Sequence, residues 1–312
     1  MRAIVFKQFG APEVLQMAEL PEPVPAPGEA LVRVAAAGVN PTDVLMRSGQ
    51  QAKLMTDLKP PYICGQEFSG HVHALGGAST RLKQGQAVMG IVNPRRPQGG
   101  AYAEYVCVPE RSLVAAPENI DLVDAATIPM NGLTARVALQ ALALPPGATL
   151  LVTGGAGALG GYVIQLANDA GIAVIADAKE QDRALLIRLG AREVVPRGEG
   201  MTAAVRDKHP AGVDGLVDAA LIGDAVAALV RDGGGVVGVR AAQPYDTQRL
   251  KVTWVSVLNQ ITNTESLEWL AERVRRKVLT PRISHRIHLA DAKEAHRLVD
   301  QGGLRGRVVL VP

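Results

Sequence analysis

One stretch near the middle of the chain limits the possible folds more than any other. An apolar run, Thr149–Thr153, has the composition of a buried strand and leads into a glycine pattern at Gly155, Gly157 and Gly160. A helical pattern with one apolar side, residues 158–170, follows directly. Strand, glycine turn and helix in this order predict a dinucleotide-binding unit, whereas the glycines alone would also fit a turn without a ligand.

Each residue of this turn has an expected task. Gly155 permits a tight turn, Gly157 lets the backbone approach a pyrophosphate, and Gly160 lets the helix and the strand pack closely. Ala158 and Leu159 begin the helix, where backbone N–H groups and the positive end of the helix dipole face the phosphates. We therefore expect these five residues to bind a cofactor.

Strands and helices alternate around this motif. We expect strands at residues 149–153, 172–176, 193–195, 213–218, 235–239 and 252–257, and helices at residues 121–128, 132–144, 158–170, 180–189, 201–208 and 222–231. Such alternation, with strands that are apolar almost throughout, predicts a parallel sheet covered by helices on both faces. Residues 121–261 are therefore predicted to form a doubly wound α/β domain.

The flanking segments have a different pattern. Residues 1–120 contain short β-rich runs separated by Gly and Pro, which is typical of a small barrel or sandwich. Residues 262–312 contain helical patterns at 266–277 and 291–301 and a last strand at 307–311. We predict that both segments form one discontinuous domain. The ligand cleft would then lie between the two domains, at the carboxyl ends of the parallel strands.

Composition narrows the class of partner. The 312 residues suffice for two domains, and a net charge of +3 with a pI near 8.9 is too mild to favour nucleic acid or an anionic membrane surface. No long run lacks Gly, Pro and charge, so no membrane span is expected. The N-terminus has no signal-peptide pattern, and two cysteines are too few for a disulfide framework. We expect a cytoplasmic protein.

Seven short motifs occur along the chain in a characteristic order. They lie at residues 37–43, 65–70, 85–88, 100–105, 132–134, 154–160 and 306–310. In this order and spacing they resemble the medium-chain dehydrogenase/reductase superfamily, and within it the zinc-free quinone oxidoreductases, over nearly the whole chain. The resemblance implies a Rossmann domain and a GroES-like catalytic domain, which agrees with the division that the patterns predict.

Two positions decide whether zinc is expected. Zinc alcohol dehydrogenases of this superfamily have a Cys and a His where this chain has Asn40 and Gln66, and neither amide is a good zinc ligand. His71 and His73 share one face of a strand and could bind a metal together, but a polar strand face explains them as well. Without zinc nothing lowers the pKa of an alcohol, so alcohol oxidation is disfavoured. We predict no metal site.

The residues after the strand at 172–176 give conflicting information about the cofactor. Asp177 lies where an acid normally binds the ribose hydroxyls of NADH and repels a 2′-phosphate. Lys179, Arg183 and Arg197 lie nearby and could bind that phosphate. By resemblance, Arg197 matches a position that contacts it, whereas Lys179 and Arg183 could be solvated helix residues. The sequence favours NADPH and leaves NADH possible because of Asp177.

The resemblance also implies residues around the reaction site. Asn40 and Thr134 would line the nicotinamide side. The strand end at Gly238 and Val239 would pass beneath the nicotinamide, and Arg307 would lie near the cofactor.

The substrate pocket is less well specified by the sequence. Tyr62, Gln66 and Met130 are candidates, although ordinary packing explains each of them equally well. No residue stands out as an obligatory general acid, and quinone or enone reduction can take its proton from water.

These features predict an NAD(P)H-dependent, zinc-independent oxidoreductase that transfers hydride to a quinone or to an α,β-unsaturated carbonyl compound. The enzyme would position the reactants and exclude water, while the cofactor supplies the hydride. One alternative is a zinc-free carbonyl or alcohol reductase. Another is a cofactor-binding protein without turnover.

The last strand of the parallel sheet, residues 252–257, predicts how the protein assembles. It contains no charge and no proline, so it should form an unprotected edge that can pair with another chain. Trp254 adds apolar surface of the kind found at interfaces. We expect a homodimer through this strand. Coverage by the loop at 240–251 or by the helix at 266–277 is the alternative.

Overall fold

The computed structural model describes residues 1–239 and 244–312, and these fall into two compact units. The first unit contains Met1–Met130, Leu258–Lys277 and Pro281–Pro312, and the second contains Asn131–Val257 and Val278–Thr280. The first unit is therefore discontinuous along the chain. The change between the units falls after residue 130, ten residues later than the sequence patterns suggest.

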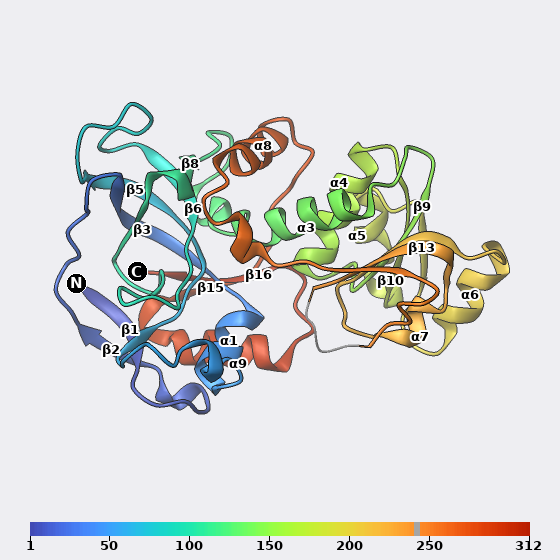
Figure 1. Ribbon diagram of the computed structural model, residues 1–312, viewed down its shortest axis with the longest axis horizontal. Coiled ribbons are helices and arrows are strands. Elements are labelled where there is room, and N and C mark those ends of the chain that lie inside the picture. The colour runs from blue at the N-terminus through green and yellow to red at the C-terminus, as the bar shows by residue number, and fades with distance from the viewer. Residues whose placement is uncertain (240–243) are drawn as a thin grey trace. The chain divides into compact units, whose positions relative to one another are not determined.

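The first unit is built on β-sheets (Figure 1). Its larger sheet has the order β15(Ile283–His288), β16(Arg307–Val311), β3(Glu29–Val39), β5(Glu67–Leu75), β6(Ala87–Ile91), β8(Leu113–Ala115), with β7(Tyr105–Pro109) also paired to β3. Its smaller sheet has the order β2(Gln16–Glu19), β1(Arg2–Phe6), β4(Tyr62–Ile63). The pairings are antiparallel except that of β15 with β16. The predicted β-rich domain is confirmed.

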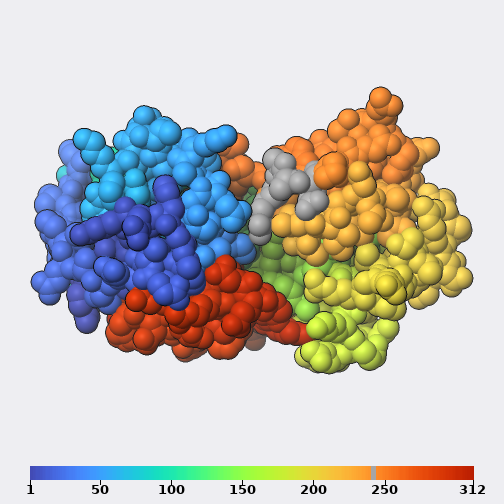
Figure 2. Space-filling model, turned by 90° about the horizontal axis from the view of Figure 1, so that it is seen from below, coloured from blue at the N-terminus to red at the C-terminus, as the bar shows by residue number. Residues whose placement is uncertain are grey.

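Helices of the first unit lie around these sheets. They are α1(Pro41–Ser48), α2(Leu122–Ala125), α8(Thr264–Arg275) and α9(Ala292–Gln301), with short 3₁₀ turns at Pro12–Val14, Ala52–Leu54, Glu110–Ser112 and Leu289–Asp291. Segments from both ends of the chain meet here, because Arg297 of α9 forms an ion pair with Glu13 at 2.7 Å. Figure 2 shows the same neighbourhood, with N-terminal residues in dark blue beside C-terminal residues in red.

The second unit contains a parallel sheet. Its order is β11(Glu193–Pro196), β10(Ala173–Ala178), β9(Thr149–Thr153), β12(Val213–Asp218), β13(Val230–Gly238), β14(Lys251–Trp254). The helices are α3(Pro129–Leu142), α4(Ala158–Asp169), α5(Arg183–Arg188), α6(Gly200–Lys208) and α7(Asp224–Ala227), with a 3₁₀ turn at Glu180–Asp182. Another 3₁₀ turn, Val257–Gln260, begins at Val257 and belongs otherwise to the first unit. The chain runs from β9 to β10 on one side and places β12 on the other. The topological switch point of this doubly wound sheet therefore lies between β9 and β12.

Several expected elements have other bounds. The helix predicted at 222–231 is wrong in extent, since α7 covers only Asp224–Ala227 and β13 begins at Val230 instead of residue 235. Pairing with β12 prevails there over the helix propensity of the Ala- and Leu-rich sequence. The predicted strand 252–257 is the shorter β14, which includes Lys251. Part of the predicted loop 240–251, residues 240–243, lies outside the described residues.

No helix in the described part of the chain is long and apolar enough to span a bilayer.

Candidate functional site

The glycine turn between β9 and α4 has the geometry of a phosphate cradle. Gly157 is the N-cap of α4, and a Cβ placed there would meet only the Gly154 carbonyl oxygen, at 3.1 Å, with open space elsewhere. A Cβ at Gly160 would overlap that same oxygen and approach the Gly154 carbonyl carbon to 2.8 Å. Gly160 is therefore required by packing inside the protein, whereas Gly157 leaves room for a ligand.

Gly155 and the first turn of α4 complete the cradle. A Cβ at Gly155 would lie 2.9 Å from the side chain of Leu186, so this glycine also serves packing. Ala158 and Leu159 are half-buried at the N-terminus of a 12-residue helix. The open position of Gly157 beside this helix end fits a pyrophosphate bound by backbone N–H groups.

Asp177 lies at the carboxyl end of β10 and is buried. Its Oδ1 accepts a hydrogen bond of 2.5 Å from the Gly154 N–H, and its Oδ2 lies 3.7 Å from Arg197 Nε. Burial raises the pKa of this carboxyl above its ordinary value, although the Gly154 N–H and Arg197 oppose the shift. The carboxylate thus supports the glycine turn and is fully buried, and its contact with a ribose stays a prediction.

The three nearby cations remain accessible to different extents. Lys179 is exposed, directly after β10. Arg183 is exposed but pairs with Glu180 at 3.3 Å, which partly neutralises its charge. The Arg197 side chain is 51% exposed, and its backbone N–H is fixed by the Ala178 carbonyl at 3.0 Å. Arg197 is therefore held beside the end of β10 with its guanidinium facing solvent.

The end of β13 is tightly packed. Gly238 is buried and Val239 is half-buried, and a Cβ at Gly238 would overlap the ring of Trp254. The Trp254 ring also lies 5.2 Å from the Tyr245 ring, centroid to centroid.

A hydrogen-bonded group at the switch point was not predicted from the sequence. Thr153 Oγ1, at the end of β9, donates to Asp218 Oδ1 at the end of β12 over 2.6 Å. Asp218 Oδ2 accepts from the Gly223 N–H at 2.8 Å and from the Tyr245 hydroxyl at 2.9 Å. The sequence does contain a sign of this group, because a polar residue, Thr153 or Asp218, is the last residue of each of these two strands.

In the first unit, Asn40 belongs to a buried polar cluster that is centred on Glu67. Asn40 Nδ2 donates to Glu67 Oε1 at 3.1 Å, and the Met130 N–H donates to Glu67 Oε2 at 2.8 Å. Arg307 Nη2 forms a buried ion pair with Glu67 Oε1. Asn40 Oδ1 is buried and has no hydrogen-bond partner in the described structure, so it offers an acceptor to a ligand. The role of Glu67 was not predicted from the sequence, although it adjoins Gln66.

Asp43 fixes the backbone on either side of this cluster. Its two carboxylate oxygens accept from the N–H groups of Asn40 and Gly65, each at 2.8 Å. Complete burial raises the pKa of Asp43 to about 6, against the lowering effect of these two hydrogen bonds. The loops that carry Asn40 and Gln66 are therefore held together by one carboxyl group.

The cluster does not fit a zinc ion. Asn40 directs its amide nitrogen, a donor, toward Glu67, and the charge of Glu67 is already balanced by Arg307. Burial raises the pKa of the neighbouring Cys64 thiol well above its ordinary value, which disfavours the thiolate that zinc requires. Within residues 1–239 and 244–312, no group of three or more His, Cys, Asp or Glu side chains could hold a metal ion.

The candidate substrate residues all have partners inside the protein. The Tyr62 hydroxyl donates to the Leu58 carbonyl at 3.2 Å. Gln66 is buried, and its backbone carbonyl accepts a hydrogen bond from the Val92 N–H at 2.7 Å. Met130 is buried, with its Sδ 3.9 Å from the Thr42 hydroxyl. Their contact with a substrate stays a prediction.

Two other predicted residues have informative surroundings. Thr134 is half-buried on α3 in the second unit, so its meeting with Asn40 of the first unit stays a prediction. Arg307 is only 6% exposed at its side chain, and its charge is used by Glu67. A direct contact of Arg307 with the cofactor also stays a prediction.

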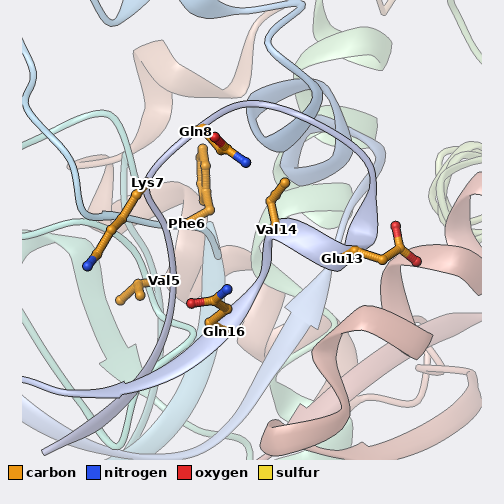
Figure 3. Close-up of a pocket in the computed structure, with 7 residues that line it drawn as sticks. All are labelled: Val5, Phe6, Lys7, Gln8, Glu13, Val14 and Gln16. Atoms are coloured by element: carbon orange, nitrogen blue, oxygen red, sulfur yellow. The ribbon is translucent and has the colours of Figure 1, made fainter.

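A surface pocket in the first unit is separate from these residues. It has a volume of about 380 Å³ and is lined by residues 5–8, Glu13, Val14 and Gln16 (Figure 3). None of the predicted site residues lines it. Its only side chains with full charges are Lys7 and Glu13, and Glu13 is paired with Arg297. We therefore do not assign the reaction to this pocket.

Comparison with known proteins agrees with the fold. The alcohol dehydrogenase GroES-like domain family matches residues 26–118, and the zinc-binding dehydrogenase family matches residues 189–310. The chain is 31% identical over 260 residues to the chloroplastic NADPH-dependent alkenal/one oxidoreductase of Arabidopsis thaliana, covering 81% of this chain and 66% of that protein.

Solved structures extend the similarity to the whole chain. The quinone oxidoreductase of Coxiella burnetii has a TM-score of 0.90 at 31% identity, covering 100% of this chain and 99% of that one. A mycobacterial protein solved in complex with NADPH has a TM-score of 0.87 at 28% identity, with both chains fully covered. The chain thus belongs to the medium-chain dehydrogenase/reductase superfamily, and within it to the quinone oxidoreductase type.

Proposed function

We propose that the protein is an NAD(P)H-dependent oxidoreductase that reduces a quinone or an α,β-unsaturated carbonyl compound. The observation that carries this proposal is the cradle at Gly157, where the N-terminus of α4 has open space for a pyrophosphate. The relatives named as quinone and alkenal/one oxidoreductases support the class of acceptor. A bound reduced nicotinamide would supply the hydride.

The residues of the chain contribute binding and orientation. Asn40 is fixed by Glu67, which leaves its buried Oδ1 as an acceptor for a hydroxyl or amide of the cofactor or substrate. An unpaired buried oxygen costs about 1–3 kcal/mol, so a ligand that donates to it gains this amount. The Asn40 and Glu67 cluster does not fit zinc, so the proposed reaction needs no metal at this position.

NADPH is the cofactor that the charges around β10 favour. The carboxylate of Asp177 is buried and faces the Gly154 N–H, so it opposes a 2′-phosphate less than an exposed acid would. The half-exposed guanidinium of Arg197 and the exposed ammonium of Lys179 can pair with that phosphate. The NADPH named for the Arabidopsis relative and bound to the mycobacterial protein points the same way.

Spectrophotometry of NADPH oxidation tests the proposal. We expect turnover with 1,4-benzoquinone, 9,10-phenanthrenequinone or a 2-alkenal, and slower turnover with NADH. Reduction of simple ketones or aldehydes alone would favour a carbonyl reductase. Tight NADPH binding without turnover on any of these acceptors would contradict the enzymatic proposal.

We further propose a homodimer that pairs β14 with its own copy across a two-fold axis. β14 is the last strand in the described order of this sheet and so forms one of its edges. The side chain of Val252 is half-buried, and that of Trp254 is exposed. The Val255 N–H donates to the Gly238 carbonyl of the same chain at 3.1 Å. Since donors alternate in direction along a strand, the outward donors are those of Val252 and Trp254.

The proline variant that tests the dimer is therefore Val252→Pro, which removes an outward donor without breaking the bond to β13. In sedimentation experiments the wild type should be a dimer at micromolar concentration, and the variant should shift toward monomer. A monomeric wild type would refute this mode of assembly.

A further inference from the structure

The switch point of the parallel sheet contains a carboxylate that joins three separate segments. Asp218 at the end of β12 is fully buried and accepts hydrogen bonds from Thr153 of β9, from the loop residue Gly223, and from Tyr245. All three donors are neutral. The Thr153 hydroxyl also accepts a hydrogen bond from the Ala220 N–H at 3.0 Å. Thr153 at the end of β9 is therefore bonded both to Asp218 at the end of β12 and to the loop that follows β12.

Tyr245 is the only one of these donors that is not part of β9 or the loop after β12. It is 8% exposed, and burial together with the nearby Asp218 raises the pKa of its hydroxyl, so it stays a donor at neutral pH. Its ring packs against Trp254, which in turn covers Gly238 at the end of β13. Tyr245 therefore connects the ends of β12, β13 and β14.

From the fold, we expect these strand ends to face one particular half of the cofactor. In a doubly wound sheet a dinucleotide crosses the switch point at the carboxyl ends of the strands. The candidate contacts for the 2′-phosphate, Lys179 and Arg197, follow β10 and β11, and the pyrophosphate cradle follows β9. The nicotinamide half must therefore extend to the other side, over the ends of β12 and β13.

We propose that Tyr245 is a positioning residue for the nicotinamide half of the cofactor, acting through its hydrogen bond to Asp218. The inference rests on the proposed function and adds to it a residue that holds the nicotinamide side of the crevice. Tyr245 fixes Asp218, and Asp218 fixes Gly223 in the loop that follows β12 at the switch point. Removal of the hydroxyl leaves the adenosine side unchanged, because no contact of Lys179 or Arg197 passes through Asp218.

The test uses Tyr245→Phe, which keeps the ring against Trp254 and removes only the donor. Binding of NADPH and of 2′,5′-ADP is measured by titration; the second ligand fills only the adenosine side. We expect NADPH to bind about five- to tenfold more weakly, since hydrogen bonds to charged groups are among the stronger ones, and 2′,5′-ADP to bind within about twofold of the wild type. Thr153→Val, which removes another donor to Asp218, should show the same difference between the ligands. In the double variant the two effects should be less than additive, because both act through Asp218.

The control is Tyr105→Phe on β7 of the first unit, which loses the same hydroxyl group and should bind both ligands like the wild type. Equal weakening of NADPH and 2′,5′-ADP in Tyr245→Phe would show a general structural role and overturn the inference, as would unchanged NADPH binding. If the wild type reduces quinones but Tyr245→Phe behaves normally, only this inference fails. If the wild type binds neither NADPH nor NADH, the proposed function fails and the inference fails with it.

Discussion

Two glycines of the same turn should respond differently to the same substitution, one mainly in cofactor binding and the other mainly in stability. In Gly157→Ala the new methyl group meets only the Gly154 oxygen at 3.1 Å, so the protein should fold, but the methyl group occupies the pyrophosphate cradle. Loss of one charge-assisted hydrogen bond costs about 1.5–3 kcal/mol, which weakens NADPH binding roughly 10- to 100-fold. The N-cap preference for Gly over Ala adds up to about 1 kcal/mol of destabilisation.

In Gly160→Ala the methyl group instead overlaps backbone atoms of Gly154 and lies 2.9 Å from the Gly155 Cα. Overpacking of this kind costs about 1–3 kcal/mol, or roughly 3–10 °C in Tm. Thermal unfolding and NADPH titration of both variants separate the two effects. The reasoning would be refuted if Gly157→Ala bound NADPH like the wild type, or if Gly160→Ala kept the wild-type Tm.

Other variants test the charges of the two units. Arg197→Ala should weaken NADPH binding by roughly 10- to 100-fold and leave NADH binding nearly unchanged; a wild type that prefers NADH would contradict this. Burial lowers the pKa of His296 to about 3, so its neutral form is favoured in the folded state, and the stability this gives is lost as pH falls from about 6.5 toward 3. From pH 7 to pH 5 the loss from this group is about 2 kcal/mol. The raised pKa of Asp43 stabilises the folded state as the pH falls below 6, which opposes the effect of His296. The effect of His296 is therefore measured as the difference in the free energy of urea unfolding between the wild type and His296→Phe. This variant keeps a ring against Tyr102. An identical pH dependence in both proteins would disprove the assignment.

The sequence predicts those features that depend on neighbours along the chain. The strand, turn and helix around Gly157 form a local pattern, and the central strands β9 and β10 are apolar over most of their length. The sequence does not predict where a side chain points when its partner is far away along the chain. The sequence pattern around Asp177 indicates a contact with a ribose, which stays a prediction, and gives no sign that this carboxylate accepts a hydrogen bond from the glycine turn. Glu67 and Arg307 form a buried pair although most of the chain separates them. At Val230, pairing with β12 starts a strand inside a predicted helix.

The position of β16 in the first unit also has a consequence for biosynthesis. This strand lies between β15 and β3, with Val308 opposite Val39 and Leu310 opposite Ala37. On a ribosome that adds about 5–20 residues each second, β3 must wait at least about ten seconds for this neighbour. The second unit lies between them in the sequence, so its sheet can form during that interval. Until β16 arrives, the end of β3 at residues 37–39 has unpaired N–H and C=O groups. A nascent chain stalled before β16 should therefore bind chaperones more readily than one released after it.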